Sequence, residues 1–289
     1  MNFKTRIFNI GRLLFMFPFL EKYLRKRMLS NPNKFVEKFI PNNYQYPINT
    51  YRVFNYKGVD LKVDIRDYVG HYLYFGFKDS GQEKLMQLVK ADFVVLDIGT
   101  NIGSTLLQFA NLAGHKGKVI GFEPDPFNYK NCIYNIGLNS FNNVIVNNIG
   151  LGNETGEFSL VVDTPTNRGG NRIQLDNPDG KEVVKIKVHK LDDWIGSANI
   201  VKVNLIKIDV EGFEMNVLKG SLETLKTHRP VFFIELDDNN LKMVGASAKV
   251  LVEFLEINGY SVVNAETDER VTGSSNFENC HYDIICRPK

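Results

Sequence analysis

The chain has 289 residues, of which 43% are hydrophobic and 24% are charged, a composition typical of a globular protein with a sizeable core. Its net charge of +2 is unevenly distributed, because residues 1–30 contain seven Lys or Arg and one Glu, which leaves the rest of the chain at −4. The main part of the chain therefore lacks the basic excess of nucleic-acid-binding proteins, and we expect no nucleic acid partner. Its three cysteines form no C-x-x-C pair and its five histidines no H-x-x-x-H pair, which predicts no metal site of that kind and suits a reducing cytoplasm.

Residues 1–45 predict a basic, apolar helical extension. The stretch IFNIGRLLFMFPFL is interrupted by Arg12 and Pro18 and is followed by EKYLRKR, so it is too short and too broken to span a bilayer. It also lacks the small-residue cleavage site of a secretory signal. Two interpretations stay open: a basic amphipathic helix that lies on an anionic membrane, or an accessory helix packed against the domain.

Residues 46–90 predict a β-hairpin and a helix that lead into the core. TYRVFNYKGVDLKVDIRD alternates with period two on both sides of Lys57 and Gly58, which is typical of a hairpin. Residues 79–90 then have the pattern of a helix. We expect a third part, residues 91–289, to form the catalytic domain.

The most informative segment is FVVLDIGTNIGS, residues 93–104. Its apolar run predicts a strand that is buried on both faces, and the residues from Ser104 to Ala113 have helical spacing. Between them, Gly99 and Gly103 allow a tight turn and a close approach of the backbone to a ligand. Strand, glycine turn and helix together predict a nucleotide site.

The residues around this turn favour S-adenosylmethionine (SAM) over a dinucleotide. A dinucleotide site uses G-x-G-x-x-G, whereas this chain has Gly99, Asn101 and Gly103. Asp97 immediately before the turn would repel a pyrophosphate but attract the ammonium and sulfonium groups of SAM. The next strand, KVIGF, ends at Glu123, at a spacing that places an acid beside the ribose.

Alternating strands and helices along the rest of the chain predict a mainly parallel sheet with helices on both faces. Further strands are expected near residues 143–147, 157–162, 183–189, 203–208, 230–235, 259–263 and 281–286, and helices over 126–137, 213–227 and 246–258. Because ligands bind beyond the carboxyl ends of such strands, one rim would collect Asp97, Glu123, Asn147 or Asn148, Asp209 and Glu235.

LIKIDVEGFE supplies the catalytic candidates. Lys207 and Asp209 share one face of a strand, so a lysine within an apolar strand must find a carboxylate or a ligand. We predict Asp209 or Glu211 as the base or orienting acid and Glu235 as the reserve candidate. Two alternatives stay open: Asp209 and Glu211 cap the next helix, or these acids, with Asp237 and Asp238, hold a divalent metal.

The loop over residues 162–182 is rich in glycine and asparagine and is a candidate for acceptor specificity. Arg168, Asn171 and Arg172 are its candidate contacts to a polar or anionic acceptor.

The motifs DIGTNIG, GFEPDPFNYKNCIYNIGLN, HKLDDW, LIKIDVEGFEMNVLKG and RPVFFIEL, in this order, resemble the FkbM family of SAM-dependent methyltransferases over about residues 70–289. The resemblance implies a Rossmann-like class I methyltransferase fold with a seven-stranded sheet and an antiparallel last strand. It also implies SAM as cofactor, with adenine at Asn148. The expected cofactor residues are Asp97, Gly99, Thr100, Asn101, Gly103, Glu123, Pro124 and Asn148.

The expected activity is O-methylation of a hydroxyl on a sugar, glycan or other small metabolite. An N-methyltransferase of the same fold and a non-catalytic SAM-binding protein are the alternatives. We expect a cytoplasmic protein, with peripheral contact to the inner face of a membrane through residues 1–30 as an open possibility.

Overall fold

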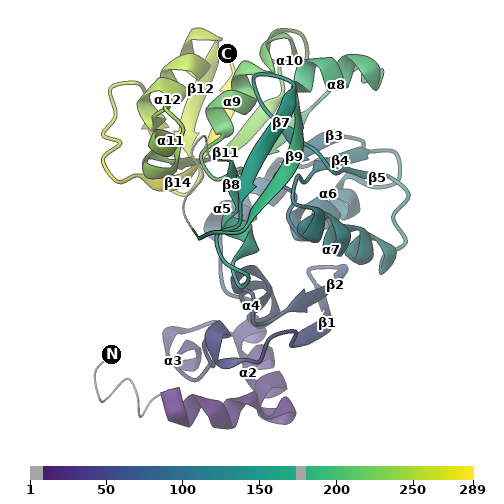
Figure 1. The fold of residues 1–289 in the computed structure, drawn as a ribbon, viewed down its shortest axis with the longest axis vertical. Helices are drawn as coiled ribbons and strands as arrows, with labels where there is room; N and C mark the ends of the chain where they lie inside the picture. The colour runs from purple at the N-terminus through teal and green to yellow at the C-terminus, as the bar shows by residue number, and fades with distance from the viewer. Residues whose placement is uncertain (1–8, 174–179) are drawn as a thin grey trace. The chain divides into compact units, whose positions relative to one another are not determined.

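The structure is a computed structural model that describes residues 9–173 and 180–289 (Figure 1). It divides into two compact units. The N-terminal unit runs to Asp79 and includes Thr164–Gly169, and the core unit comprises Ser80–Asp163 and Gly170–Lys289. Among the described residues, no helix is both long enough and apolar enough to cross a membrane.

The N-terminal unit consists of short helices and one hairpin. Its elements are η1 (Leu14–Met16), α2 (Pro18–Ser30), α3 (Lys34–Glu37), η2 (Asn43–Gln45), β1 (Tyr51–Tyr56), β2 (Val59–Asp64) and α4 (Tyr68–Phe75). The predicted hairpin is confirmed, since β1 and β2 pair antiparallel with Tyr56 opposite Val59. Lys57 and Gly58 both have positive φ, 50° and 92°, as a two-residue type I′ turn requires.

Helix α2 is packed within its own unit. Leu24 and Met28 are only 3% and 1% exposed. Pro18 occupies the first turn, where the backbone N–H groups have no partner within the helix, so the N–H that proline lacks is not needed. This packing lies within the N-terminal unit, and the interpretation in which the helix packs against the catalytic domain stays a prediction. The membrane interpretation stays a prediction, and residues 1–8, on which part of it rests, lie outside the described residues.

The core unit is built on one large sheet with the strand order β13-β12-β14-β11-β10-β3-β4-β5. The strands are β3 (Val94–Ile98), β4 (Lys118–Phe122), β5 (Val144–Asn147), β10 (Leu205–Ile208), β11 (Val231–Asp237), β12 (Tyr260–Asn264), β13 (Arg270–Val271) and β14 (His281–Pro288). The pairs from β11 to β5 are parallel, and β14 runs antiparallel to β11 and β12. The class I methyltransferase fold and its antiparallel last strand are confirmed. The sheet has eight strands instead of seven because the two-residue β13 pairs with β12.

Helices cover both faces of this sheet, which explains the uninterrupted apolar runs of its strands. One face packs against α5 (Ser80–Leu88), α6 (Ser104–Ala113) and α7 (Pro126–Gly137), and the other against α8 (Leu191–Ser197), α9 (Glu214–Lys219), α10 (Leu222–Thr227), α11 (Asp238–Met243) and α12 (Ala248–Ile257). Alternate residues of one strand serve opposite faces: Leu96 belongs to one core cluster and Val95 to the other.

Two of the predicted strands leave the main sheet. They pair in a separate sheet of order β6-β9-β7-β8, formed by β6 (Gly150–Leu151), β7 (Gly156–Val161), β8 (Arg172–Ile173) and β9 (Val183–His189), with η3 (Arg168–Gly170) preceding β8. The single helix expected over residues 213–227 is wrong, because it is interrupted between α9 and α10. Ser221, with φ of −125° and ψ of 20°, departs from helical geometry there. A Cβ at Gly220 would lie 1.9 Å from the backbone oxygen of Gly152, so this close approach requires glycine.

The order of the strands fixes where a ligand can bind. From β3 the chain proceeds to β4 and β5 with α6 and α7 on one face, whereas from β10 it proceeds outward to β11 with α9 and α10 on the other. The connections after β3 and β10 therefore diverge to opposite faces, which leaves a crevice at the carboxyl ends of these neighbouring strands.

Candidate active site

The turn after β3 is so tight that its first position excludes any side chain. Gly99 and Gly103 have φ of +82° and +88°, in the left-handed region that favours glycine. A Cβ at Gly99 would lie 1.8 Å from the backbone oxygen of Asp209. Thr100 ties the turn to β4, because its hydroxyl accepts a hydrogen bond of 3.0 Å from the N–H of Phe122. The strand end thus presents backbone to a ligand.

Glu123 holds this turn from the end of β4. Its carboxylate oxygens accept hydrogen bonds from the N–H groups of Asn101 and Asp125, at 2.7 and 2.9 Å. Burial raises the pKa of Glu123 to about 8, although the two N–H donors oppose the rise. Since a carboxylate oxygen can accept more than one hydrogen bond, Glu123 retains capacity for ligand hydroxyls.

Asn148 lies directly after β5, beside the segment that follows β4. Its amide group donates to the backbone oxygens of Glu123 and Pro124, at 2.8 and 3.1 Å. Asn147 instead donates to the backbone oxygen of Gly121 at 3.2 Å. Of the two asparagine side chains, that of Asn148 is therefore the one that hydrogen-bonds the expected cofactor residues.

Lys207 connects the glycine turn with the acids on β10. Its Nζ donates to the backbone oxygen of Gly99 at 2.9 Å and lies 3.1 Å from Asp209 Oδ2 and 3.5 Å from Asp97 Oδ1. Burial lowers the pKa of Lys207, but the two carboxylates outweigh it and raise that pKa overall. The expectation that this lysine finds a carboxylate is confirmed.

Asp97 is fully buried, and neither of its oxygens has a hydrogen-bond donor among the described residues. Burial raises the pKa of Asp97 to about 6, although Lys207 opposes the rise. The negative charge of Asp97 therefore depends on Lys207, and its oxygens could still accept hydrogen bonds.

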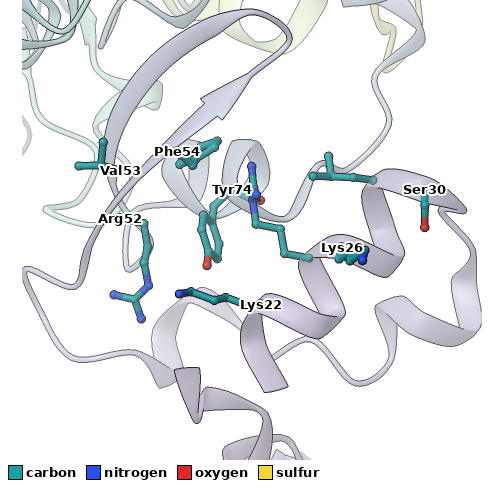
Figure 2. Close-up of a pocket in the computed structure, with 9 residues that line it drawn as sticks. Lys22, Lys26, Ser30, Arg52, Val53, Phe54 and Tyr74 are labelled. Carbon is teal, nitrogen blue, oxygen red and sulfur yellow. Dashed lines mark hydrogen bonds between the residues drawn. The ribbon is translucent and has the colours of Figure 1, made fainter. Parts of the chain in front are cut away.

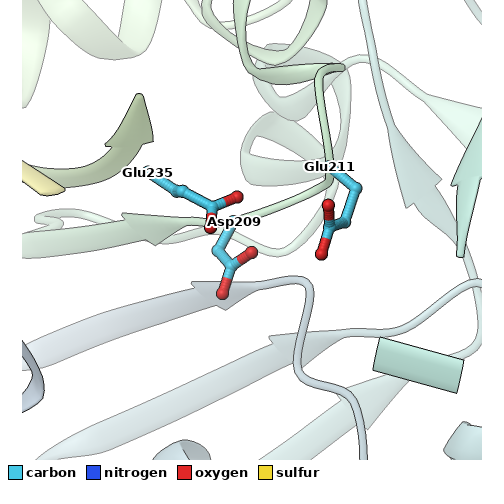
Figure 3. Close-up of side chains that lie close together, drawn as sticks. All are labelled: Asp209, Glu211 and Glu235. Atoms are coloured by element: carbon cyan, nitrogen blue, oxygen red, sulfur yellow. The ribbon is translucent and has the colours of Figure 1, made fainter. Parts of the chain in front are cut away.

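Three carboxylates converge at the carboxyl ends of β10 and β11, with Glu235 near the end of β11 itself and Asp209 and Glu211 after β10 (Figure 3). One oxygen from each of Asp209, Glu211 and Glu235 lies within 4.8 Å of the others. Burial, and then the charges of Asp209 and Glu211, raise the pKa of Glu235 to about 10. Burial and the charge of Asp209 raise the pKa of Glu211 to about 7, against the effect of Arg172. At neutral pH Glu235 is therefore a neutral acid and Glu211 is partly ionised.

The same three acids are spaced closely enough for their oxygens to ligate one hard cation. Asp237 and Asp238, which the metal alternative also invoked, have other partners. Asp237 accepts the N–H groups of Asn239 and Asn240, and Asp238 accepts the N–H of Ala248 and pairs with a lysine. They do not extend the cluster, and a metal at the three acids stays an untested alternative.

Glu211 sits in an unusual backbone conformation. Its φ of 54° lies in the left-handed region, which non-glycine residues rarely adopt, and Gly212 follows with φ of 104°. The Glu211 carboxylate accepts a 2.9 Å hydrogen bond from Asn240 Nδ2, and Asn240 Oδ1 accepts one of 3.4 Å from Arg172 Nη1. This chain of contacts orients Glu211 in the cluster. Asn240 carries no signal in the sequence that would have identified it.

Glu214 is the residue that holds the Glu211 turn. Its Oε1 accepts the N–H groups of Val210 and Gly212, at 3.1 and 3.0 Å, and burial raises its pKa to about 7. Phe213, the residue before α9, makes no side-chain cap hydrogen bond. Among the described residues, neither Asp209 nor Glu211 hydrogen-bonds an N–H group of α9, and the alternative in which their charges favour this helix through its dipole stays untested. Glu214 is the acid of IDVEGFE for which the sequence predicted no role.

The loop proposed for specificity contributes one residue to this neighbourhood. Arg172 approaches Asn240 as described, whereas Asn171 donates to Asp125 at 2.8 Å and Arg168 belongs to the N-terminal unit. Residues 174–179 of this loop lie outside the described residues.

The arrangement fits SAM on the chemistry of its donors and acceptors. Asp97 has buried oxygens that lack hydrogen-bond donors, Glu123 is fixed at the next strand end, and Gly99 leaves the backbone bare between them. An ammonium group and two ribose hydroxyls supply the donors that such carboxylates accept.

The model of the Methyltransferase FkbM domain matches residues 97–262, which include the glycine turn, both acidic strand ends and the three converging carboxylates. The chain belongs to this family. It is a SAM-dependent methyltransferase, as predicted, and SAM is its cofactor.

Two curated relatives and one solved structure illustrate the similarity. The 2-O-methyltransferase NoeI of Sinorhizobium fredii is 27% identical over 175 residues, which cover 53% of this chain and 67% of that protein. The hexuronic acid methyltransferase AglP of Haloferax volcanii is 26% identical over 178 residues, which cover 60% and 70%. The crystal structure of Methyltransferase FkbM from Methylobacillus flagellatus is 17% identical, with a TM-score of 0.43, over 75% of this chain and 52% of that one, a likeness too low to be informative.

Proposed function

We propose that this methyltransferase acts on a hydroxyl oxygen of a sugar, glycan or other small metabolite, at the cluster formed by Asp209, Glu211 and Glu235. The observation that carries the proposal is the convergence of these carboxylates, within 4.8 Å, beside the glycine turn of the cofactor site. A hydroxyl acceptor must lose a proton when it gains a methyl group. A partly ionised carboxylate at that position can take it.

In this proposal Asp97, Gly99, Thr100, Asn101, Gly103, Glu123, Pro124 and Asn148 hold the cofactor. The ribose hydroxyls donate to Glu123, and the methionine end lies near Asp97. SAM, when bound, supplies a methyl group that is already activated by a sulfonium. The protein's own task is to orient the acceptor oxygen, exclude water from it and receive its proton.

The three acids have different tasks, which follow from their different protonation at neutral pH. Glu211, with a pKa of about 7, accepts the acceptor's hydroxyl proton as the new carbon–oxygen bond forms and the carbon–sulfur bond breaks. Asp209, 43% exposed and paired with Lys207, orients the acceptor. Glu235, with a pKa of about 10, stays protonated and donates a hydrogen bond. The products are a methyl ether, S-adenosylhomocysteine and one proton on Glu211.

The names of the relatives support an acceptor of this class. One is a 2-O-methyltransferase and the other is a hexuronic acid methyltransferase. A cluster of carboxylates would also attract a cationic amine, so N-methylation is the second candidate.

The test is methyl transfer from labelled SAM to a panel of hydroxylated and amine acceptors, with the parent protein, Asp209→Asn and Glu211→Gln. We expect both variants to fold and keep their SAM affinity by calorimetry, while turnover falls at least about 100-fold, the usual contribution of a general base. In the parent, the rate should rise with pH through about 7 as Glu211 ionises, and Glu211→Gln should lose this dependence.

Glu154→Gln, the same chemical change at an exposed position in a loop of the core unit, is the matched control. Parent-like turnover in both acid variants would exclude the proposed roles. Loss of parental activity with a chelator, restored by magnesium, would favour the metal alternative. Methylation of amines alone would establish the second candidate.

We also propose that the protein works in the cytoplasm. Cys132, Cys280 and Cys286 are all buried and free, as suits a reducing compartment. Peripheral contact with a membrane, if made, would come from the N-terminal unit.

A further inference from the structure

The N-terminal unit contains a basic groove that shares no residue with the candidate active site (Figure 2). The groove, about 620 Å³ in volume, lies between α2 and the β1–β2 hairpin. Its four cations are Lys22, Arg25, Lys26 and Arg52, and in the described part of the chain no acidic side chain lines it. The remaining lining is largely apolar or aromatic and includes Leu29 and Phe54.

Among the described residues, Arg52 is the only one of these cations that is paired with a carboxylate. Arg52 donates to both carboxylate oxygens of Glu21, at 2.8 and 3.0 Å, and this pair is mostly buried. Arg25 donates to the backbone oxygens of Tyr74 and Asn55 and lies over two aromatic rings, so it is anchored while its charge meets no carboxylate.

Lys22 and Lys26 are both exposed, and the side-chain ammonium group of neither makes a hydrogen bond or an ion pair with another described residue. Together with Arg25, they leave three positive charges without a counterion at one groove. Such a cluster attracts an anion from outside the protein.

Large apolar side chains are exposed next to these charges. Buried Leu24 and Met28 define the inner face of α2, so helical periodicity places Phe19, Tyr23 and Lys26 on the opposite, outer face. Phe19 and Tyr23 are 70% and 56% exposed. Further exposed apolar side chains in the same segment are those of Ile10, Leu13, Leu14, Phe17 and Leu29. Exposed apolar residues concentrated in one segment mark an interaction site.

The two features together identify the kind of partner. A soluble phosphate or a nucleic acid backbone would neutralise the lysines but would leave the exposed Leu and Phe side chains in water. A bilayer with anionic headgroups satisfies both, because phosphates meet the cations while apolar side chains enter the acyl boundary. We propose that the groove formed by Lys22, Arg25 and Lys26 binds the phosphate headgroup of an anionic phospholipid, and that the exposed apolar residues of this segment enter the membrane surface beside it.

The experiment is co-sedimentation of the full-length protein with vesicles of phosphatidylcholine, with and without phosphatidylglycerol, at low and physiological salt. The parent should bind the vesicles that contain phosphatidylglycerol, more weakly at the higher salt concentration, and should not bind vesicles of pure phosphatidylcholine. Neutralising Lys22→Gln and Lys26→Gln together should reduce partitioning about 25-fold, since each basic residue contributes about fivefold near an anionic surface.

Two further variants make the result specific. Lys185→Gln with Lys187→Gln removes the same charge from exposed positions on β9 in the core unit and should leave binding unchanged. Phe19→Ser with Tyr23→Ser keeps the charge and should also weaken binding, because apolar insertion is lost. All of these positions are exposed or at the surface, and an unchanged melting temperature verifies that each variant folds.

Three outcomes would overturn the proposal. The parent could stay in the supernatant with phosphatidylglycerol vesicles at low salt. The two lysine pairs could reduce binding equally, which would indicate attraction through net charge alone. Inorganic phosphate or diphosphate could raise the melting temperature of the parent but not of the Lys22 and Lys26 variant while no vesicle is bound, which would identify a site for a soluble anion.

Discussion

Replacing Glu235 by Gln should stabilise the protein at alkaline pH. Glu235 lies beside Asp209 and Glu211, and its buried Oε2 has no hydrogen-bond partner among the described residues. Burial and the neighbouring charges raise its pKa from 4.5 to about 10. Between these two values the native protein holds a proton that the unfolded chain has released, so stability falls as pH rises across this window.

The size of the effect follows from that window. Each unit of pKa difference corresponds to about 1.4 kcal/mol, so about 5 kcal/mol is the upper limit at about pH 8. Changes in ionisation within the cluster and the partial exposure of Glu235 reduce this energy below its upper limit. We therefore expect Glu235→Gln to raise the free energy of unfolding by about 2 kcal/mol. For a chain of this length that is about 4 °C in melting temperature. At about pH 4.5, where the native state is protonated and the unfolded chain about half protonated, the difference should be small.

The assay is thermal unfolding of the parent and Glu235→Gln at a series of pH values between these limits. Glu223→Gln, with a side chain that is 67% exposed on α10, is the matched control and should show no such trend. A difference between Glu235→Gln and the parent that is independent of pH would refute the reasoning. So would a variant that is less stable than the parent at the alkaline end.

Two other substitutions probe the cofactor turn and the buried lysine. Glu123→Ala should weaken the binding of SAM at least about tenfold by calorimetry, because two ribose hydroxyls lose their hydrogen-bond partner, and unchanged affinity would remove Glu123 from the site. Lys207→Met should lower the free energy of unfolding by about 3 to 5 kcal/mol, because it leaves Asp97 buried without a counterion. Adding Asp97→Asn to Lys207→Met should recover part of that loss in urea unfolding, and a double variant no more stable than Lys207→Met would contradict the pairing.

The large sheet could be predicted from the sequence because its strands are buried on both faces. Runs such as FVVL and VIGF have no polar alternation, and they are followed closely by the glycine turn and by Glu123, respectively. Local pattern could not predict which strands leave the main sheet. The partner of a strand is decided by tertiary contacts, and β7 and β9 pair with each other in a separate sheet.

The sequence was sufficient to predict which acids form the site but not what each of them contacts. The topology of parallel strands brings Asp209 and Glu235 to one edge whatever their neighbours are. Whether Glu211 caps a helix depends on the backbone. Its φ of 54° turns the chain so that Glu214, three residues later, accepts the N–H groups of the turn. Asn240, whose side chain donates a hydrogen bond to Glu211, lies in α11, and no feature of the sequence near the motif indicates this contact.

The two units carry opposite charge at their candidate sites. The cluster of Asp209, Glu211 and Glu235 repels an anionic group at the point of methyl transfer, and Arg172, which acts on Glu211 through Asn240, offsets this only in part. The groove of Lys22, Arg25 and Lys26 favours anions, within a unit of its own. The acceptor hydroxyl at the cluster is therefore expected to belong to an uncharged part of its molecule, whereas the anion expected at the groove is the phospholipid headgroup that the vesicle experiment tests separately.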